Sequence, residues 1–172
     1  SLNTGLVFGL YCLLGEIGHA AGMATVPEWY FEGDAVMAET LFSDSGRGRT
    51  PAFDAELRAQ LLSGRRFSYY KAMLGSYKDY DPLASPYLLG YFMTAAMRTE
   101  YSVLMVEDAK RTRSWIPIIP YNFDLAVLLN MGKFPSDIYE KAMDDITVRW
   151  EKQLEGLTFT GAESVIPVAA DQ

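Results

Sequence analysis

One stretch decides how this 172-residue chain folds: Pro27-Glu28-Trp29-Tyr30-Phe31-Glu32-Gly33-Asp34-Ala35-Val36-Met37-Ala38-Glu39-Thr40. A proline at its start is typical of a first helical turn, where the missing N–H costs nothing. On the predicted helix, residues of mixed character lie on roughly one face: Trp29, Glu32, Val36 and Glu39. Two carboxylates among apolar neighbours are expensive to bury unless they meet an arginine, backbone N–H groups or a metal ion.

The pattern Trp29-x-x-Glu32-Gly33-x-Ala35-x-x-x-Glu39 resembles the second metal-binding helix of gluzincin-type zinc metallopeptidases. The similarity is greatest to the peptidase-like domain that precedes TolB-type β-propellers in bacterial envelope proteins. This resemblance implies that Glu32 is the third zinc ligand and that an upstream H-E-x-x-H helix supplies the first two. It also implies that Asp34 or Glu39 orients those histidines through hydrogen bonds.

The rest of such a zinc site has no candidates in this sequence. The chain contains no H-E-x-x-H and only one histidine, His19, which has no partner four residues away. We therefore interpret His19 as a solvated or locally hydrogen-bonded residue of a glycine-rich loop rather than a zinc ligand. The chain is expected to begin after the H-E-x-x-H helix and to carry half of a site.

A turn-rich loop follows the organising helix and contains Gly46-Arg47-Gly48-Arg49. Similar envelope proteins carry a comparable G-R-G-R after this helix. The sequence leaves two interpretations of Arg47 and Arg49 open. Either arginine folds back onto Glu39 or Asp34, or the arginines bind a carboxylate of the substrate.

A second segment, Pro86-Tyr87-x-x-Gly90-Tyr91-Phe92, shows the same family resemblance. The resemblance implies that Tyr87 faces the metal site and stabilises an oxyanion. Packing in the core is the alternative that the sequence favours for Tyr87. A glycine inside a helix weakens it, so Gly90 is predicted to allow close approach of another backbone.

Composition narrows the class of protein. A hydrophobic content of 49% and an aromatic content of 13% provide a core for one domain and argue against disorder throughout. The net charge of −7 with scattered lysines and arginines argues against a nucleic-acid surface and against docking on anionic lipid. Cys12 is the single cysteine, so no internal disulfide forms, and its apolar neighbours predict a buried small side chain.

The predicted fold is all-α, an irregular multi-helix domain over residues 1–157 that resembles the C-terminal part of a gluzincin peptidase domain. Residues 158–172 are predicted to be a linker or tail, with a possible strand at 158–160. Helices are predicted at 6–14, 27–42, 53–62, 69–74, 86–101, 104–113, 123–131 and 137–154, with an extended connector at 115–121. Ser85 is the predicted N-cap of the helix that begins at Pro86, and Ser136 is that of the helix that begins at Asp137. No apolar run is long enough to span a bilayer, and no signal peptide is visible.

The resemblance sets the functional expectation. The parent protein is expected to be a zinc peptidase of the bacterial periplasm or cell envelope, acting on a peptide or protein. This chain alone is expected neither to hold catalytic zinc nor to hydrolyse peptides, because it needs the upstream helix. A downstream β-propeller is a further expected partner, whereas nucleic acid and a membrane span are not.

The alternative is a non-catalytic helical scaffold or partner-binding module of the cell envelope. In that case Glu32 and Glu39 pair with Arg47 or Arg49 as a structural ion network. A carboxylate-bridged di-iron bundle would need paired Glu-x-x-His motifs, and the sequence has none.

Overall fold

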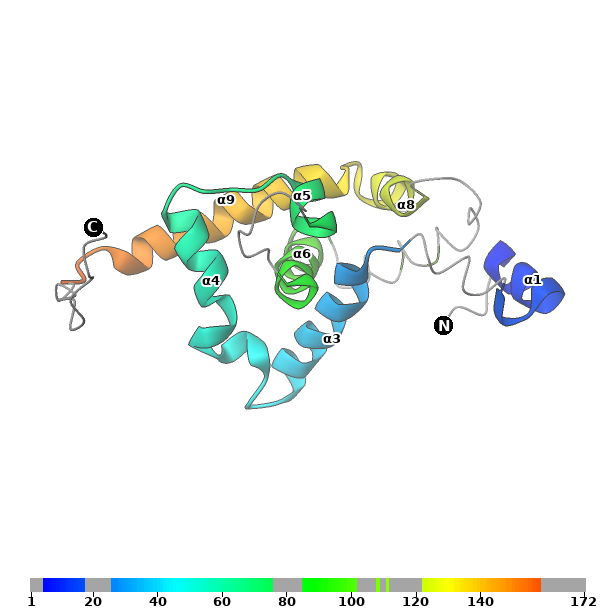
Figure 1. Cartoon of the computed structure of the whole chain (residues 1–172), viewed down its shortest axis with the longest axis horizontal. Coiled ribbons are helices and arrows are strands. Elements are labelled where there is room, and N and C mark those ends of the chain that lie inside the picture. Colours follow the sequence, from blue (N-terminus) through cyan, green and yellow to red (C-terminus); the bar gives the residue numbers. More distant parts are fainter. Residues whose placement is uncertain are drawn as a thin grey trace, which may run out of the picture.

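The computed structural model describes residues 5–17, 26–75, 85–101, 108, 111 and 122–158. Every regular element in these residues is helical, which confirms the predicted all-α class (Figure 1). The elements are α1 (Gly5–Leu14), α3 (Glu28–Phe42), the 3-10 turn η1 (Arg47–Arg49), α4 (Pro51–Leu62), α5 (Tyr69–Leu74), α6 (Pro86–Glu100), α8 (Asn122–Met131) and α9 (Pro135–Leu154). The order and spacing follow the sequence-based prediction closely.

Several helix starts have a clear local cause. The Ser85 side chain accepts a hydrogen bond from the Tyr87 N–H at 3.2 Å, and Pro86 occupies the first position of α6, as predicted. Several predicted starts were wrong by one or two residues, including that of α4, which begins at Pro51 rather than at Phe53. Helix α3 begins at Glu28, immediately after Pro27, and α9 begins at Pro135 rather than at Asp137.

Helix α9 begins earlier than predicted because the Asp137 side chain caps it from within the first turn. Its carboxylate accepts a hydrogen bond from the Phe134 N–H at 3.2 Å. The contact gives the Phe134 N–H, at the residue just before the helix, an acceptor. The acidic residue of a capping box plays the same part. Ser136, which the sequence suggested as the cap, therefore lies within the helix.

Helices α3 and α6 form the closest helix pair among the described elements. They meet at Gly33 and Gly90, where each glycine lies against the backbone of the other helix. A Cβ atom on Gly33 would collide with the backbone of Gly90, and a Cβ on Gly90 would collide with the Trp29 carbonyl oxygen. The predicted role of Gly90 is confirmed, and Gly33 is its partner.

The buried face of α3 differs from the predicted one. The side chains that are buried on it are Trp29, Tyr30, Gly33, Val36 and Thr40. Glu32 and Glu39 are only partly buried, so they lie at the margin of this face rather than within it. The two carboxylates therefore flank the buried residues of α3, and the α6 contact itself is made at Gly33.

Trp29 lies at the centre of the aromatic core. Its ring contacts Tyr30, Tyr69 and Phe123 edge to face, with ring centroids 5.9, 6.4 and 5.7 Å away. The Trp29 Nε1–H donates a hydrogen bond to the Tyr69 hydroxyl at 3.2 Å, which satisfies the one polar atom of the buried indole. Burial raises the pKa of Tyr69.

Helix α9 contributes buried side chains to the same core as α3 and α6. Trp150, Ile146 and Met143 are among its buried residues, and Figure 1 shows α9 running past α4, α6 and α5. Arg66, which follows α4, donates hydrogen bonds to Glu140 at 3.1 Å and to Asp144 at 2.6 Å. The Tyr139 hydroxyl donates to the Phe67 carbonyl oxygen at 2.9 Å, so the segment between α4 and α5 is tied to α9.

Helix α1 lies at one end of the molecule in Figure 1, apart from the helices that form the core. Its apolar side chains are largely exposed, with Leu13 at 82%. Cys12 is exposed too, so the prediction of a buried cysteine was wrong; no residue of α1 belongs to the described core. None of the helices that the structure describes is long and apolar enough to cross a membrane.

Some predictions fall outside the described residues. They are the loop with His19, most of the predicted helix at 104–113, the connector at 115–121 and the linker or strand beyond Thr158.

Candidate functional site

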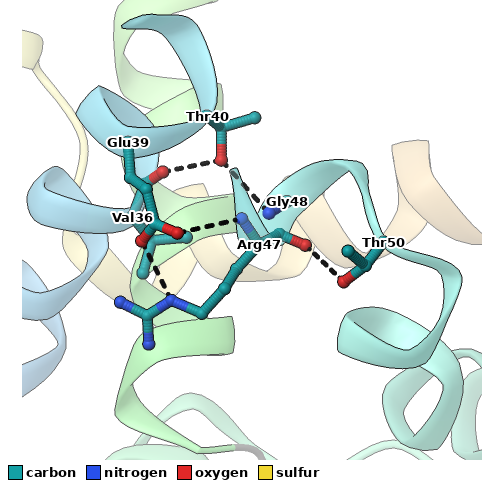
Figure 2. Close-up of polar contacts among 6 residues, drawn as sticks. All are labelled: Val36, Glu39, Thr40, Arg47, Gly48 and Thr50. Carbon is teal, nitrogen blue, oxygen red and sulfur yellow. Dashed lines mark hydrogen bonds and ion pairs between the residues drawn. The ribbon is translucent and has the colours of Figure 1, made fainter. Parts of the chain in front are cut away.

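The C-terminal end of α3 brings together three of the residues singled out in the sequence, and Figure 2 shows two of them, Glu39 and Arg47. The Glu39 carboxylate accepts hydrogen bonds from the Arg47 backbone N–H at 3.2 Å and from Arg47 Nε at 3.0 Å. The Arg47 guanidinium also lies over the Tyr87 ring, 5.0 Å from its centroid. Glu39, Arg47 and Tyr87 therefore form one contact chain from α3 through η1 to α6.

Thr40 connects the same loop to the helix end. Its hydroxyl donates a hydrogen bond to the Val36 carbonyl oxygen at 2.7 Å and accepts one from the Gly48 N–H at 3.1 Å (Figure 2). Arg49 Nε donates to the Thr40 carbonyl oxygen at 3.1 Å. The last carbonyl groups of a helix have no partner within it, so Arg49 satisfies a group that would otherwise need water.

The glycines of Gly46-Arg47-Gly48-Arg49 have a steric explanation. A Cβ atom on Gly46 would lie 2.7 Å from the Glu39 carbonyl oxygen, and one on Gly48 would lie 2.6 Å from Thr40 Oγ1. Only glycine lets the loop approach the helix end this closely. Thr40 was not among the site residues predicted from the sequence, although a threonine at the end of a helix before a glycine-rich loop could have indicated this role.

The other carboxylates of α3 have different surroundings. Asp34 accepts a hydrogen bond from Arg98 Nη2 of α6, so this pair links the two helices beyond their glycine contact. Glu32 makes no hydrogen bond or ion pair with another residue that the structure describes. Of the three predicted site carboxylates, Asp34 and Glu39 thus bind arginines and Glu32 does not.

The predicted interpretation of the arginines is resolved in part. Arg47 folds back onto Glu39, as one of the two interpretations required, whereas Arg49 binds the helix backbone rather than a carboxylate. No arginine of this loop reaches Asp34 among the described contacts, because Asp34 is paired with Arg98.

The loop changes the pKa of the Glu39 carboxyl. Hydrogen bonds from the Arg47 side chain and backbone lower the pKa of Glu39. A carboxyl whose pKa is lower in the folded than in the unfolded state stabilises the protein above its unfolded pKa. That contribution disappears as the pH falls through the folded-state pKa.

Replacing Glu39 by glutamine is therefore expected to destabilise the protein at neutral pH and to have progressively less effect as the pH falls below about 4, the usual range for glutamate. Thermal unfolding of both proteins followed by circular dichroism over a pH series measures this difference. Glu56→Gln, on the exposed side of α4, removes the same charge away from the loop and serves as the control. A difference that stays constant with pH would show that the loop does not stabilise the ionised form.

The described residues do not contain a complete metal centre. No group of three or more histidine, cysteine, aspartate or glutamate side chains is arranged to hold a metal ion within residues 5–17, 26–75, 85–101 and 122–158. His19 lies outside these residues. Of the carboxylates that the sequence predicted for the site, Glu32 is the one without a described partner.

Comparisons with protein-family models, with curated proteins and with solved structures found no match to this chain. The functional interpretation therefore depends on the geometry of α3 and on the residue pattern that it carries.

Proposed function

We propose that this chain is the glutamate-supplying part of a zinc metallopeptidase-like domain of the bacterial cell envelope, with Glu32 as the third metal ligand. The contrast among the α3 carboxylates supports this proposal. Asp34 and Glu39 bind arginines, whereas the partly buried Glu32 has no described partner. A metal ligand needs a fixed helix and a carboxylate that is not already neutralised by a cation, and Glu32 meets both conditions.

The chain does not fit a catalytic zinc centre by itself. Such a centre takes three protein ligands and keeps one open position, and this sequence has a single histidine. Two nitrogen donors must therefore come from another stretch of polypeptide. On this proposal the chain alone is inactive, and it needs the segment that carries them.

The residues around Glu32 have supporting roles in this proposal. Asp34 and Glu39 hold α6 and η1 against α3 through their arginines, which sets the position of the helix that carries Glu32. Tyr87 is the candidate donor to a developing oxyanion. Its ring is held beneath Arg47, and its hydroxyl makes no hydrogen bond with another described residue.

The test compares this chain with a version lengthened by the residues that its gene encodes before Ser1. Only the longer protein is expected to bind stoichiometric zinc and to cleave a peptide. Glu32→Ala in the longer protein should weaken zinc binding by at least about 100-fold, since losing even a group that supports a ligand costs 10–100-fold. Zinc content by plasma mass spectrometry and competition with a chromophoric chelator measure the effect.

Glu28→Ala is the matched control for that experiment. Glu28 lies one turn before Glu32 on α3, is exposed, and should leave zinc binding unchanged. Zinc binding that survives Glu32→Ala would show that Glu32 is not a ligand. Tight zinc and peptidase activity in the 172-residue chain alone would refute the proposed division of the site.

A second candidate function, a non-catalytic helical scaffold of the envelope, is favoured by the two ion pairs themselves. Asp34–Arg98 and Glu39–Arg47 join α3 to α6 and η1 without any role for a metal. Absence of zinc from the longer protein as well as from this chain would favour the scaffold.

A further inference from the structure

The guanidinium of Arg47 is held in place but only partly used. The Glu39 carboxylate accepts a hydrogen bond from Arg47 Nε at 3.0 Å. One face of the guanidinium lies against the Tyr87 ring, with its Cζ 5.0 Å from the ring centroid. Neither contact occupies Nη1 or Nη2, and these two nitrogens make no hydrogen bond with another described residue. The side chain is 48% exposed, so its outer edge is open to a ligand.

Arg49, two residues after Arg47 in η1, is also anchored through its Nε. Its Nε donates to the Thr40 carbonyl oxygen at 3.1 Å, which leaves both terminal nitrogens without a described partner. Arg47 and Arg49 are thus anchored through Nε to consecutive residues of α3, Glu39 and Thr40. The anchoring fixes two guanidinium groups beside the same helix end and leaves their donor edges unoccupied.

Such an edge suits a carboxylate. The two terminal nitrogens of arginine match the two oxygens of a carboxylate in a pair of parallel hydrogen bonds. Because the side chain is already ordered, binding loses less conformational entropy than binding to a freely moving arginine.

Charge favours a singly charged ligand over a multiply charged one. Glu39 offsets one of the two arginines, so the three side chains together carry a single positive charge. The whole chain has a net charge of −7, which repels phosphate dianions more strongly than a single carboxylate.

We propose that Arg47 and Arg49 form a peptide-carboxylate-binding site, with Arg47 as the main contact. Its role in substrate recognition rests on the proposed peptidase function, but carboxylate binding itself requires no metal. The ligand is a peptide that presents a carboxylate, at its C-terminus or on an acidic side chain, to the loop between α3 and α4.

Fluorescence anisotropy with the full chain, without added metal, tests this site. The probes are three fluorescein-labelled alanine pentapeptides: one with a free C-terminus, one with a C-terminal amide, and one amide with a central glutamate. At least one of the two carboxylate peptides is expected to bind roughly tenfold more tightly than the plain amide. Equal affinity for all three peptides would overturn the proposal, and the stronger of the acidic probes identifies the source of the carboxylate.

Arg47→Lys keeps the charge but removes the planar fork, and it should abolish the preference over the amide. Arg49→Lys should reduce the preference less and provides a second variant should Arg47→Lys perturb the loop, which the melting temperature reports. Arg149→Lys on α9, an exposed arginine without a described partner, is the matched control and should bind as the wild type does. An unchanged preference in both loop variants, or stronger competition by inorganic phosphate than by acetate, would contradict the assignment.

These outcomes are separable from those of the zinc experiment. The anisotropy measurement uses the metal-free chain, so failure of carboxylate binding leaves Glu32 as a ligand untouched. Failure of zinc binding in the longer protein would equally leave a carboxylate site on the loop.

Discussion

Gly33→Ala is expected to lower the free energy of unfolding by about 3 kcal/mol, which for a chain of this size corresponds to a fall in melting temperature of roughly 6–12 °C. The new Cβ would occupy the space of the Gly90 backbone, including its Cα and carbonyl groups. A backbone cannot rotate away as a flexible side chain can. Helices α3 and α6 would have to separate, and the packing on both sides of their contact would loosen.

Gly9→Ala is the matched control for this substitution. Gly9 also lies within a helix, α1, but a Cβ there would meet no atom within 4 Å. Alanine should be neutral or stabilise that helix by up to about 1 kcal/mol, since glycine is a poor helix former. Chemical denaturation of both variants measures the two effects, and equal stability of Gly33→Ala and Gly9→Ala would show that the helices do not meet as described.

Gly90→Ala tests the same contact from the other helix. Its Cβ would collide with the Trp29 carbonyl oxygen and with Gly33, so we expect a comparable loss of stability. Because both substitutions force apart the same pair of helices, the double variant should lose less than the sum of the two single losses. Full additivity would indicate two independent sites.

Trp29→Ala is the second substitution with a large expected effect, a loss of about 3–5 kcal/mol. The indole is 1% exposed and is surrounded by three aromatic rings, so its removal leaves a cavity that rigid neighbours cannot fill. It also removes the hydrogen-bond donor of the buried Tyr69 hydroxyl. Urea denaturation followed by far-ultraviolet circular dichroism measures the loss.

Phe42→Ala provides the comparison for that variant. Phe42 lies at the other end of α3 and is 88% exposed, so truncating it should change stability by no more than about 0.5 kcal/mol. Trp29→Phe separates the two causes, because it keeps most of the packing and loses the Nε1–H. A Trp29→Ala protein as stable as Phe42→Ala would contradict the central position of the indole in the core.

The family-like pattern of the organising helix has a structural explanation in this fold that does not involve a metal. In Trp29-x-x-Glu32-Gly33, the tryptophan anchors the aromatic core and the glycine makes the contact with α6. Glu32 is the member of the pattern that packing does not explain. Zinc binding by the Glu32→Ala variant therefore tests whether Glu32 is present in this pattern as a metal ligand.

Much of the helical structure could be predicted because its causes are local. Ser85 and Pro86 determine the start of α6 through one side-chain hydrogen bond and one fixed backbone angle. Short, strongly apolar segments such as those of α5 and α8 were found within one residue of their observed ends. The starts of α4 and α9 were less accurate and lie two residues before the predicted ones, because Pro51 occupies the first turn of α4 and Asp137 caps α9 from within its first turn.

The candidate site was less predictable. The sequence named the residues themselves: Glu32, Asp34, Glu39, Arg47, Arg49 and Tyr87. It offered the Arg47–Glu39 pair as one of two alternatives, but it did not give the partners of Asp34 and Arg49. Arg98, the partner of Asp34, is 64 residues away along the chain. Thr40 was not predicted, although its hydroxyl joins the loop to the helix. The exposed position of Cys12 also escaped prediction, because an apolar sequence does not show whether its helix reaches the core.

The all-α class, most helix limits and the need for glycine at position 90 could be predicted from the residues alone, because periodicity, caps and backbone freedom act over a few neighbouring residues. The buried face of α3, the pairing of Gly33 with Gly90 and the choice of carboxylates that bind arginines followed from the packing of the helices. These outcomes depend on distances through space between helices far apart in the chain. An ion pair or a close backbone contact exists only once both helices are in place.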